Sequence, residues 1–172
     1  SSDTWGTSYA GHFLTEAESK GYYVPADLIR RWKNFQQNKA IEWRRNDAYR
    51  NSDLIQAYRL YTLARAGATE LGAMNRLREE RNLTPSAAWM LASAFAIAGQ
   101  KEAAQTLIRE LPLAVRPYRE LGYTYGSTLR DKALILETLV LLDERTRAFD
   151  VLKEISSAMG DHGYWMSTQE TA

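Results

Sequence analysis

The stretch AAWMLASAFAIAG, Ala87–Gly99, decides the fold. Thr84 and Pro85 come just before it, and this pair is typical of a helix N-cap followed by the first helical residue. Before the final glycine, only Ser93 is polar, so a helix over this stretch is apolar on every side. Because such a helix is stable only when most of its surface is covered, we expect it in the interior of an all-α protein.

The same layout occurs twice more. AYRLYTLARAG, from Ala57, and KALILETLVLLDE, from Lys132, are also largely apolar. Each of the three segments is followed by a helical pattern that is apolar on one face only. The units recur at roughly 30 to 45 residues, the spacing of helical-hairpin repeats. We therefore predict an inner layer of apolar helices and an outer layer of one-sided helices, as an open solenoid or a closed ring.

The remaining segments extend this helical pattern at both ends. Tyr9, Phe13 and Ala17 fall on one face of a first helix, and a second helix begins near Pro25. A longer connection, 112–126, contains prolines and several tyrosines and leads to Thr128, a predicted helix cap. The chain is thus expected to form a single domain over residues 1–172.

The last residues carry the start signal of a further helix. Ser167 and Glu170 have the S-x-x-E spacing of a capping box, but the apolar run that normally follows is missing before Ala172. We expect the chain to be a piece of a longer protein.

Composition excludes several classes of function. Lys plus Arg number 22 and Asp plus Glu number 21, for a net charge of +1, which favours neither nucleic acid nor an anionic membrane. No apolar run approaches the ~20 residues of a membrane span, so no membrane insertion by this chain is expected. There is no cysteine, which excludes disulfides, thiolate metal sites and cysteine nucleophiles within these residues.

Few residues are candidates for chemistry, and we predict no catalytic, cofactor-binding or metal-binding residue. His12 is expected to pack or to face solvent, and Asp161 beside His162 is too small a set for a metal site. Glu137 is expected to line the axis of the ring or to pair with Arg130 or Lys132. The basic group around Arg30, Arg31, Lys33, Arg44 and Arg45 is expected to be a solvated helix face.

Aromatic side chains gather in two places and form a possible contact surface for other domains or partners. The predicted contact residues are Tyr123, Tyr125, His162, Tyr164 and Trp165.

Three stretches resemble segments of bacterial alpha-2-macroglobulin-like proteins. They are WGTSYAGHFLTEAESKGYYVP (Trp5–Pro25), YGSTLRDKALILETL (Tyr125–Leu139) and YWMSTQETA (Tyr164–Ala172), and they lie in the family's order. The resemblance implies the thioester-containing domain of the alpha-2-macroglobulin and complement superfamily. The implied fold is a partial α/α toroid built of helical hairpins with inner and outer helix layers.

The resemblance also implies a function. The family traps proteases, either through a thioester in a C-x-E-Q motif or sterically, and this sequence contains no such motif. The chain would then be a structural scaffold of an endopeptidase inhibitor, not an enzyme, with no cofactor. Its partners would be the other domains of the parent protein and, through the parent, target proteases. Its location would be the periplasm, the cell envelope or the extracellular space.

Two alternatives remain open at this stage. A helical-repeat interaction scaffold has similar inner and outer helices, although its repeats are more regular in length. An α/α-barrel enzyme such as an inverting glycosidase needs paired carboxylates at a cavity, and Asp161 and Glu170 are the best candidates.

Overall fold

The computed structural model describes residues 4–161 apart from 47, 50 and 121. Over these residues the chain forms helices and no strand, with β-pairing limited to an isolated bridge between Arg119 and Ser127. The helices are α1 (Thr4–Ser19), α2 (Ala26–Glu42), α3 (Ser52–Arg65), α4 (Leu71–Arg78), α5 (Pro85–Ile97), α6 (Lys101–Ile108), α7 (Thr128–Leu141) and α8 (Arg145–Asp161). The all-α prediction is confirmed.

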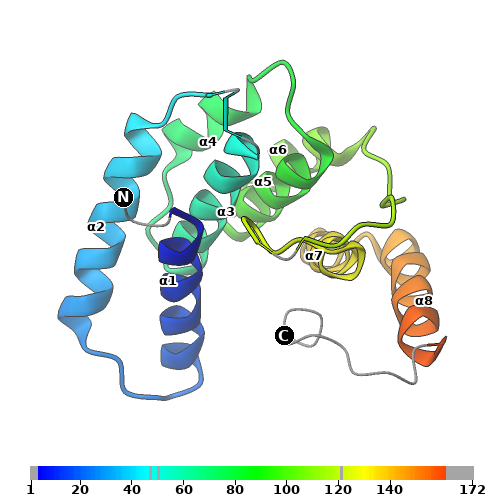
Figure 1. The fold of residues 1–172 in the computed structure, drawn as a ribbon, viewed down its shortest axis with the longest axis horizontal. Helices are drawn as coiled ribbons and strands as arrows, with labels where there is room; N and C mark the ends of the chain where they lie inside the picture. Colours follow the sequence, from blue (N-terminus) through cyan, green and yellow to red (C-terminus); the bar gives the residue numbers. More distant parts are fainter. Residues whose placement is uncertain (1–3, 47, 50, 121, 162–172) are drawn as a thin grey trace.

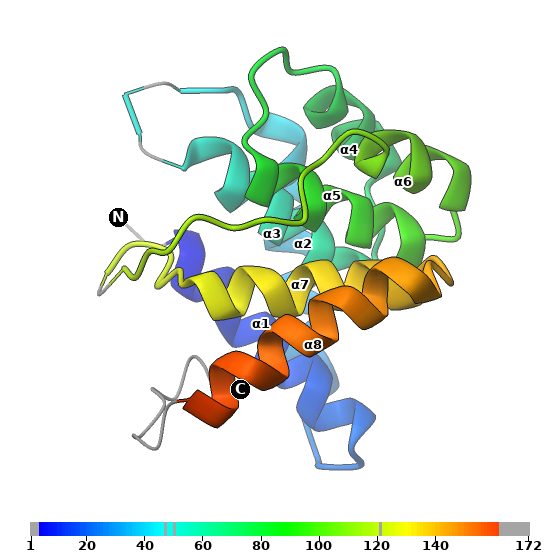
Figure 2. The ribbon, with the colours of Figure 1, turned by 90° about the vertical axis from the view of Figure 1, so that its right-hand side faces the viewer.

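The helices form two layers. In the inner layer α1 packs on α3, α3 on α5 and α5 on α7, while each even-numbered helix packs on the odd-numbered helix before it. Figure 1 shows the described helices following an arc from α1 and α2 to α7 and α8, and Figure 2 shows α8 lying across the outside of α7. The predicted inner and outer tiers are therefore present, with α1 and α2 as a further hairpin.

The core lies in the middle of the arc. Every residue of α5 from Ala87 to Ala96 is buried, as its all-round apolar pattern predicts. The Thr84 hydroxyl accepts a hydrogen bond from the Ala87 amide at 3.4 Å, which confirms the predicted cap. A bilayer-crossing helix is not found in the described part of the chain, since none there is both long and apolar enough.

Helix α1 is present as predicted, but its packed face is not its apolar stripe. Tyr9 and Phe13 are 59% and 68% exposed. The buried face includes Gly11, where an added Cβ would lie 1.8 Å from the Trp32 ring of α2. The Trp32 indole N–H donates to the Thr7 carbonyl at 2.9 Å. A glycine that admits an indole sets the rotation of α1, and sequence periodicity does not detect this contact.

The cap of α7 is shifted by one residue from the prediction. Ser127 is the N-cap, and its hydroxyl accepts from the Arg130 amide at 3.1 Å. The predicted cap, Thr128, instead accepts a hydrogen bond from the Tyr118 amide at 2.9 Å. The Thr128 hydroxyl is therefore used to hold the preceding connection against the start of α7.

Candidate functional site

Two of the predicted contact residues, Tyr123 and Tyr125, lie in the described part of the chain. Their side chains are 77% and 43% exposed. Both have left-handed backbone conformations, with φ of 58° and 51°, which are uncommon for residues other than glycine. The other predicted contact residues, His162, Tyr164 and Trp165, lie outside the described residues, as does the predicted capping box.

Backbone and side-chain hydrogen bonds hold this tyrosine loop, residues 118–127. The Glu120 amide donates to the Gly126 carbonyl at 2.7 Å, and the Thr124 hydroxyl donates to the Glu120 carboxylate at 2.7 Å. The guanidinium of Arg130 donates to the Thr124 carbonyl at 2.7 Å. These bonds stabilise a backbone conformation that local preference disfavours. The loop therefore presents its two tyrosines in a defined geometry.

A buried carboxylate lies at the base of the tyrosine loop. Asp131 of α7 is 4% exposed and accepts hydrogen bonds at 2.8 Å from the hydroxyls of Tyr118 and Ser86. Arg130 adds two N–H donors at 2.8 and 3.1 Å. Burial, followed by the hydrogen bond to Asp131, raises the pKa of Tyr118, so its hydroxyl remains a donor. This cluster joins α5, α7 and the loop.

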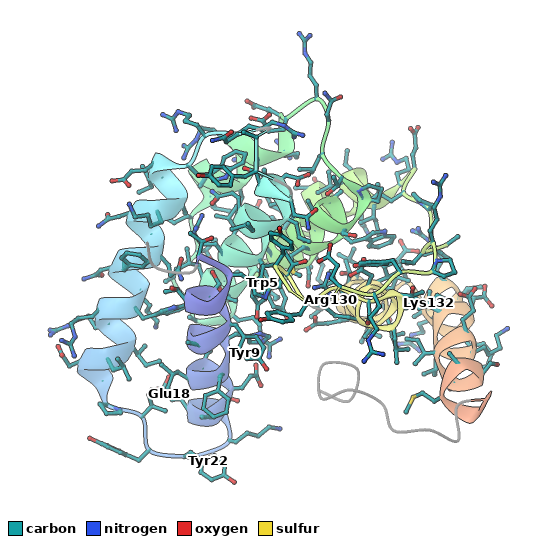
Figure 3. All side chains as sticks on the ribbon, in the orientation of Figure 1. Trp5, Tyr9, Glu18, Tyr22, Arg130 and Lys132 are labelled. Carbon is teal, nitrogen blue, oxygen red and sulfur yellow. The ribbon has the colours of Figure 1, made fainter. Side chains whose placement is uncertain are left out.

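The starts of α1 and α7 also meet at the inner layer. Trp5 stacks on Tyr58 of α3, with the ring centroids 4.3 Å apart. The guanidinium of Arg130 lies 5.7 Å from the Trp5 ring centroid, in a cation–π contact, and Figure 3 shows the two residues side by side. Arg130 thus connects the tyrosine loop to the first helix of the arc.

Glu137 does not pair with either of the predicted partners, Arg130 or Lys132. Its carboxylate accepts a hydrogen bond from Arg65 at 2.9 Å, and the Tyr61 hydroxyl lies 3.0 and 3.1 Å from its two oxygens. Burial and then the Glu137 charge raise the pKa of Tyr61. The predicted pairing considered only neighbours along the same helix, whereas Glu137 meets side chains of α3. The alternative, that Glu137 lines the axis of the ring, stays a prediction.

His12 packs within the inner layer, which is one of the two environments predicted for it. Its Nδ1 lies 3.0 Å from the Tyr58 hydroxyl, and its Nε2 lies 3.9 Å from Glu16. Its ring meets Tyr61 edge-on, with centroids 5.5 Å apart. Burial, followed by the charge of Arg65, holds the His12 pKa below its ordinary value, while Glu16 acts in the opposite direction. His12 is therefore neutral near neutral pH.

Sequence reasoning missed a buried polar cluster around Arg59 of α3. Arg59 is 4% exposed and donates to the side-chain carbonyl of Gln36 at 2.9 Å and to that of Gln56 at 2.5 Å. Gln56 in turn donates to the Ala40 carbonyl at 3.0 Å. Burial lowers the pKa of Arg59 to about 10. The available signal was the pair of long polar side chains three residues apart in an apolar helix.

Arg30 and Arg31, two residues of the predicted basic group, lie on a solvated face of α2. The side chains of Arg30 and Arg31 are both 72% exposed and pair with Asp27, one turn earlier. Trp32, the aromatic residue between the basic positions, is buried. Across the described residues, no group of three His, Asp or Glu side chains is placed to hold a metal ion.

Comparisons with known proteins find relatives of this chain in both sequence and fold. Over 182 aligned residues the chain is 31% identical to alpha-2-macroglobulin of Escherichia coli (strain K12), covering 97% of this chain and 11% of that protein. In a crystal structure of trypsin-activated Escherichia coli alpha-2-macroglobulin, the matching region has a TM-score of 0.77 and 28% identity. That match covers 99% of this chain and 12% of that one.

The chain is alpha-2-macroglobulin-like.

A second bacterial protein supports the same relationship. Salmonella alpha-2-macroglobulin reacted with methylamine matches with a TM-score of 0.77 and 27% identity, over 99% of this chain and 12% of that one. No protein-family model matches the chain. The alpha-2-macroglobulin-like chain spans 11% of the length of the curated relative. The match over nearly its whole length, together with the two helix layers, confirms the predicted partial toroid.

Proposed function

We propose that the chain is a structural segment of an alpha-2-macroglobulin-like endopeptidase inhibitor that traps proteases. The similarity to Escherichia coli alpha-2-macroglobulin in both sequence and fold, over 97–99% of the chain, carries this proposal. Solved structures of that relative include a trypsin-activated and an elastase-activated form. The parent protein would act on proteases in the periplasm, the cell envelope or the extracellular space.

The role of this segment within the parent would be mechanical and not enzymatic. It contains no cysteine and so supplies no thioester. Its inner layer is cross-connected by the contacts of Arg65 and Arg130, which suit a scaffold that must keep its shape when neighbouring domains rearrange. A solved structure of the native relative, spanning the residues from domain MG7 to the C-terminus, also matches 99% of this chain, with a TM-score of 0.75 and 26% identity.

The tyrosine loop would contact another domain of the parent. Two exposed aromatic side chains on a well-held loop provide a large contact area with little loss of conformational entropy on binding. His162, Tyr164 and Trp165 are further candidates for this surface, from the sequence alone. The other domains of the parent would therefore be the direct partners of this segment, and proteases its partners only through the parent.

The function is tested with the full-length product of the parent gene. We expect incubation with trypsin or elastase to produce a complex of altered mobility on a native gel. The trapped protease should retain activity on a small peptide substrate and lose activity on a large protein substrate. If the proteases degrade the parent without being retained, and their activity on large substrates is undiminished, the proposal is wrong.

The contact surface is tested by replacing Tyr123 and Tyr125 together with serine, in the parent and in the 172-residue chain. We expect the thermal stability of the parent to fall while that of the chain is unchanged. The matched control is Tyr23→Ser, since Tyr23 is 89% exposed at the other end of the arc. Equal effects of the double variant on the parent and on the chain would mean that the loop serves only local folding.

A further inference from the structure

One carboxylate of the inner layer lies between two basic side chains. Glu16 of α1 pairs with Arg65 of α3. The same Glu16 oxygen lies 3.9 Å from the His12 Nε2, one helical turn earlier on α1. Arg65 also pairs with Glu137 of α7 at 2.9 Å. Arg65 therefore links α1 to α7, and Glu16 is the α1 side of that link.

Protonation of His12 would change the hydrogen bonds and ion pairs that this cluster can form. Burial raises the pKa of Tyr58, so its hydroxyl keeps its proton and can donate to Nδ1 of a neutral His12, at 3.0 Å. The ring proton of His12 is then on Nε2, toward Glu16. An imidazolium donates from both nitrogens and accepts from neither. The Tyr58 hydroxyl would lose its acceptor, and Glu16 would gain a second cation.

We propose that His12 is an acid-sensitive switch of the inner layer, which on protonation draws Glu16 away from Arg65 and loosens α1 from α3 and α7. The neutral ring supports the packing of α1 on α3 seen in the structure, because it does not compete with Arg65 for Glu16 and because its Nδ1 accepts a hydrogen bond from the Tyr58 hydroxyl. The charged ring opposes it through repulsion of Arg65 and competition for Glu16. The switch belongs to this segment itself and does not depend on protease trapping by the parent.

Within the described residues, few titratable or charged groups face His12. On the side of α2, the uncharged Trp32 indole packs against α1 at Gly11. Glu137 of α7 contacts Arg65 and Tyr61, which link it to the surroundings of His12. The titratable or charged groups around the ring are Glu16 on α1, Tyr58, Tyr61 and Arg65 on α3, and Glu137 on α7.

The direction of the pH effect follows from linkage. The pKa of His12 is lowered by burial first and by Arg65 second, so the unfolded chain binds more protons than the folded chain as pH falls past the ordinary value of 6.5. Folding stability contributed by neutral His12 is complete above that value. It declines with acidification until His12 is protonated in the folded state as well.

The first measurement is an NMR titration of the His12 ring in the 172-residue chain, with His12→Gln to assign the resonance. We expect a midpoint below the ordinary histidine value. Thermal unfolding from about pH 7.5 to about pH 5.5 should lower Tm by about 2–4 °C more in the wild type than in His12→Gln. A His12 midpoint at the ordinary value, or parallel Tm profiles of the two proteins, would overturn the proposal.

The second measurement separates a switch from a merely buried histidine. Double-mutant cycles with Glu16→Gln and Arg65→Met report the coupling of that pair, and cycles with Glu137→Gln and Arg65→Met provide the matched control. On acidification we expect the Glu16–Arg65 coupling to fall at least twofold and the Glu137–Arg65 coupling to persist. If the Glu16–Arg65 coupling is unchanged while His12 titrates, Glu16 stays paired with Arg65 when His12 is protonated, and the proposal fails.

Discussion

Two arginines on α3, Arg59 and Arg65, are held in opposite ways. Arg59 is 4% exposed and its contacts are the neutral side-chain carbonyls of Gln36 and Gln56. A guanidinium removed from water without a carboxylate partner depends on hydrogen bonds for its stability, and burial accordingly lowers its pKa to about 10.

Arg65, by contrast, lies at the rim of the inner layer. Its side chain is 29% exposed and pairs with two carboxylates, Glu16 and Glu137, which are themselves 37% and 35% exposed. Solvent and salt reach this cluster, so its strength depends on conditions. The comparison indicates that the α2–α3 contact at Arg59 is shielded from solvent, whereas the α1–α3–α7 contact at Arg65 can respond to its surroundings.

The largest expected effect comes from the contact between α1 and α2, at Gly11. Gly11→Ala would place a Cβ 1.8 Å from the Trp32 ring, so the indole must move and its bond to the Thr7 carbonyl is lost. We expect a loss of about 3 kcal/mol or more in the free energy of unfolding, measured by urea denaturation. The control is Gly72→Ala, since a Cβ there meets only the Arg76 side chain at 3.7 Å. Equal stability of the two variants would refute the close contact.

Arg59→Met tests whether the buried guanidinium is needed. It leaves the carbonyl oxygens of Gln36 and Gln56 without their donor, at a cost of about 2–3 kcal/mol in unfolding free energy. Because the lost partners are neutral and buried, we expect the same cost at low and at high salt. A loss that shrinks strongly with salt in denaturation experiments would show that Arg59 acts through an unrecognised charge.

Arg65→Met should have a smaller and salt-dependent effect. Its contacts with Glu16 and Glu137 are partly exposed, so we expect a loss of about 1 kcal/mol at low salt that decreases at high salt. The same denaturation series as for Arg59→Met measures it. A cost equal to that of Arg59→Met, independent of salt, would contradict the distinction between the two sides of α3.

The smallest expected effect is that of Tyr61→Phe. The Tyr61 hydroxyl contacts Glu137, but that carboxylate keeps its bond to Arg65 and its access to water. We therefore expect a loss of about 0.5–1 kcal/mol, seen as a small shift in the denaturation midpoint. A loss above that of Arg65→Met would mean that the hydroxyl, and not the guanidinium, is the main connection to α7.

The predictions from sequence succeeded where local pattern is sufficient. The apolar runs from Ala57, Ala87 and Lys132 each form an inner helix. The first two are buried almost throughout, because a helix that is apolar all round has no stable alternative to burial, whereas α7 is only partly covered and its Val140 is 64% exposed. They failed where the partner comes from another element. The partner of Glu137 is far away in sequence, and the rotation of α1 depends on Trp32 of the next helix.

In the candidate site, too, local pattern revealed the residues, whereas contacts between elements were not visible from the sequence. The sequence marked Tyr123 and Tyr125 as unusual because aromatic residues are concentrated in a long connection. It did not reveal their left-handed backbone or the Asp131 cluster beneath them. His12 was visible as a histidine on a helix, but its position between Tyr58 and Glu16 was not, since those contacts need α1 and α3 to be packed together.

Sequence alone determined the helical class, the alternation of inner and outer helices and the similarity to bacterial alpha-2-macroglobulins, since these depend on periodicity and residue order. Tertiary structure alone decided which face of each helix is covered and which charge meets which. The physical reason is range: helical periodicity is set by residues within one or two turns, whereas burial, pKa and ion pairing depend on neighbours that only folding brings into contact.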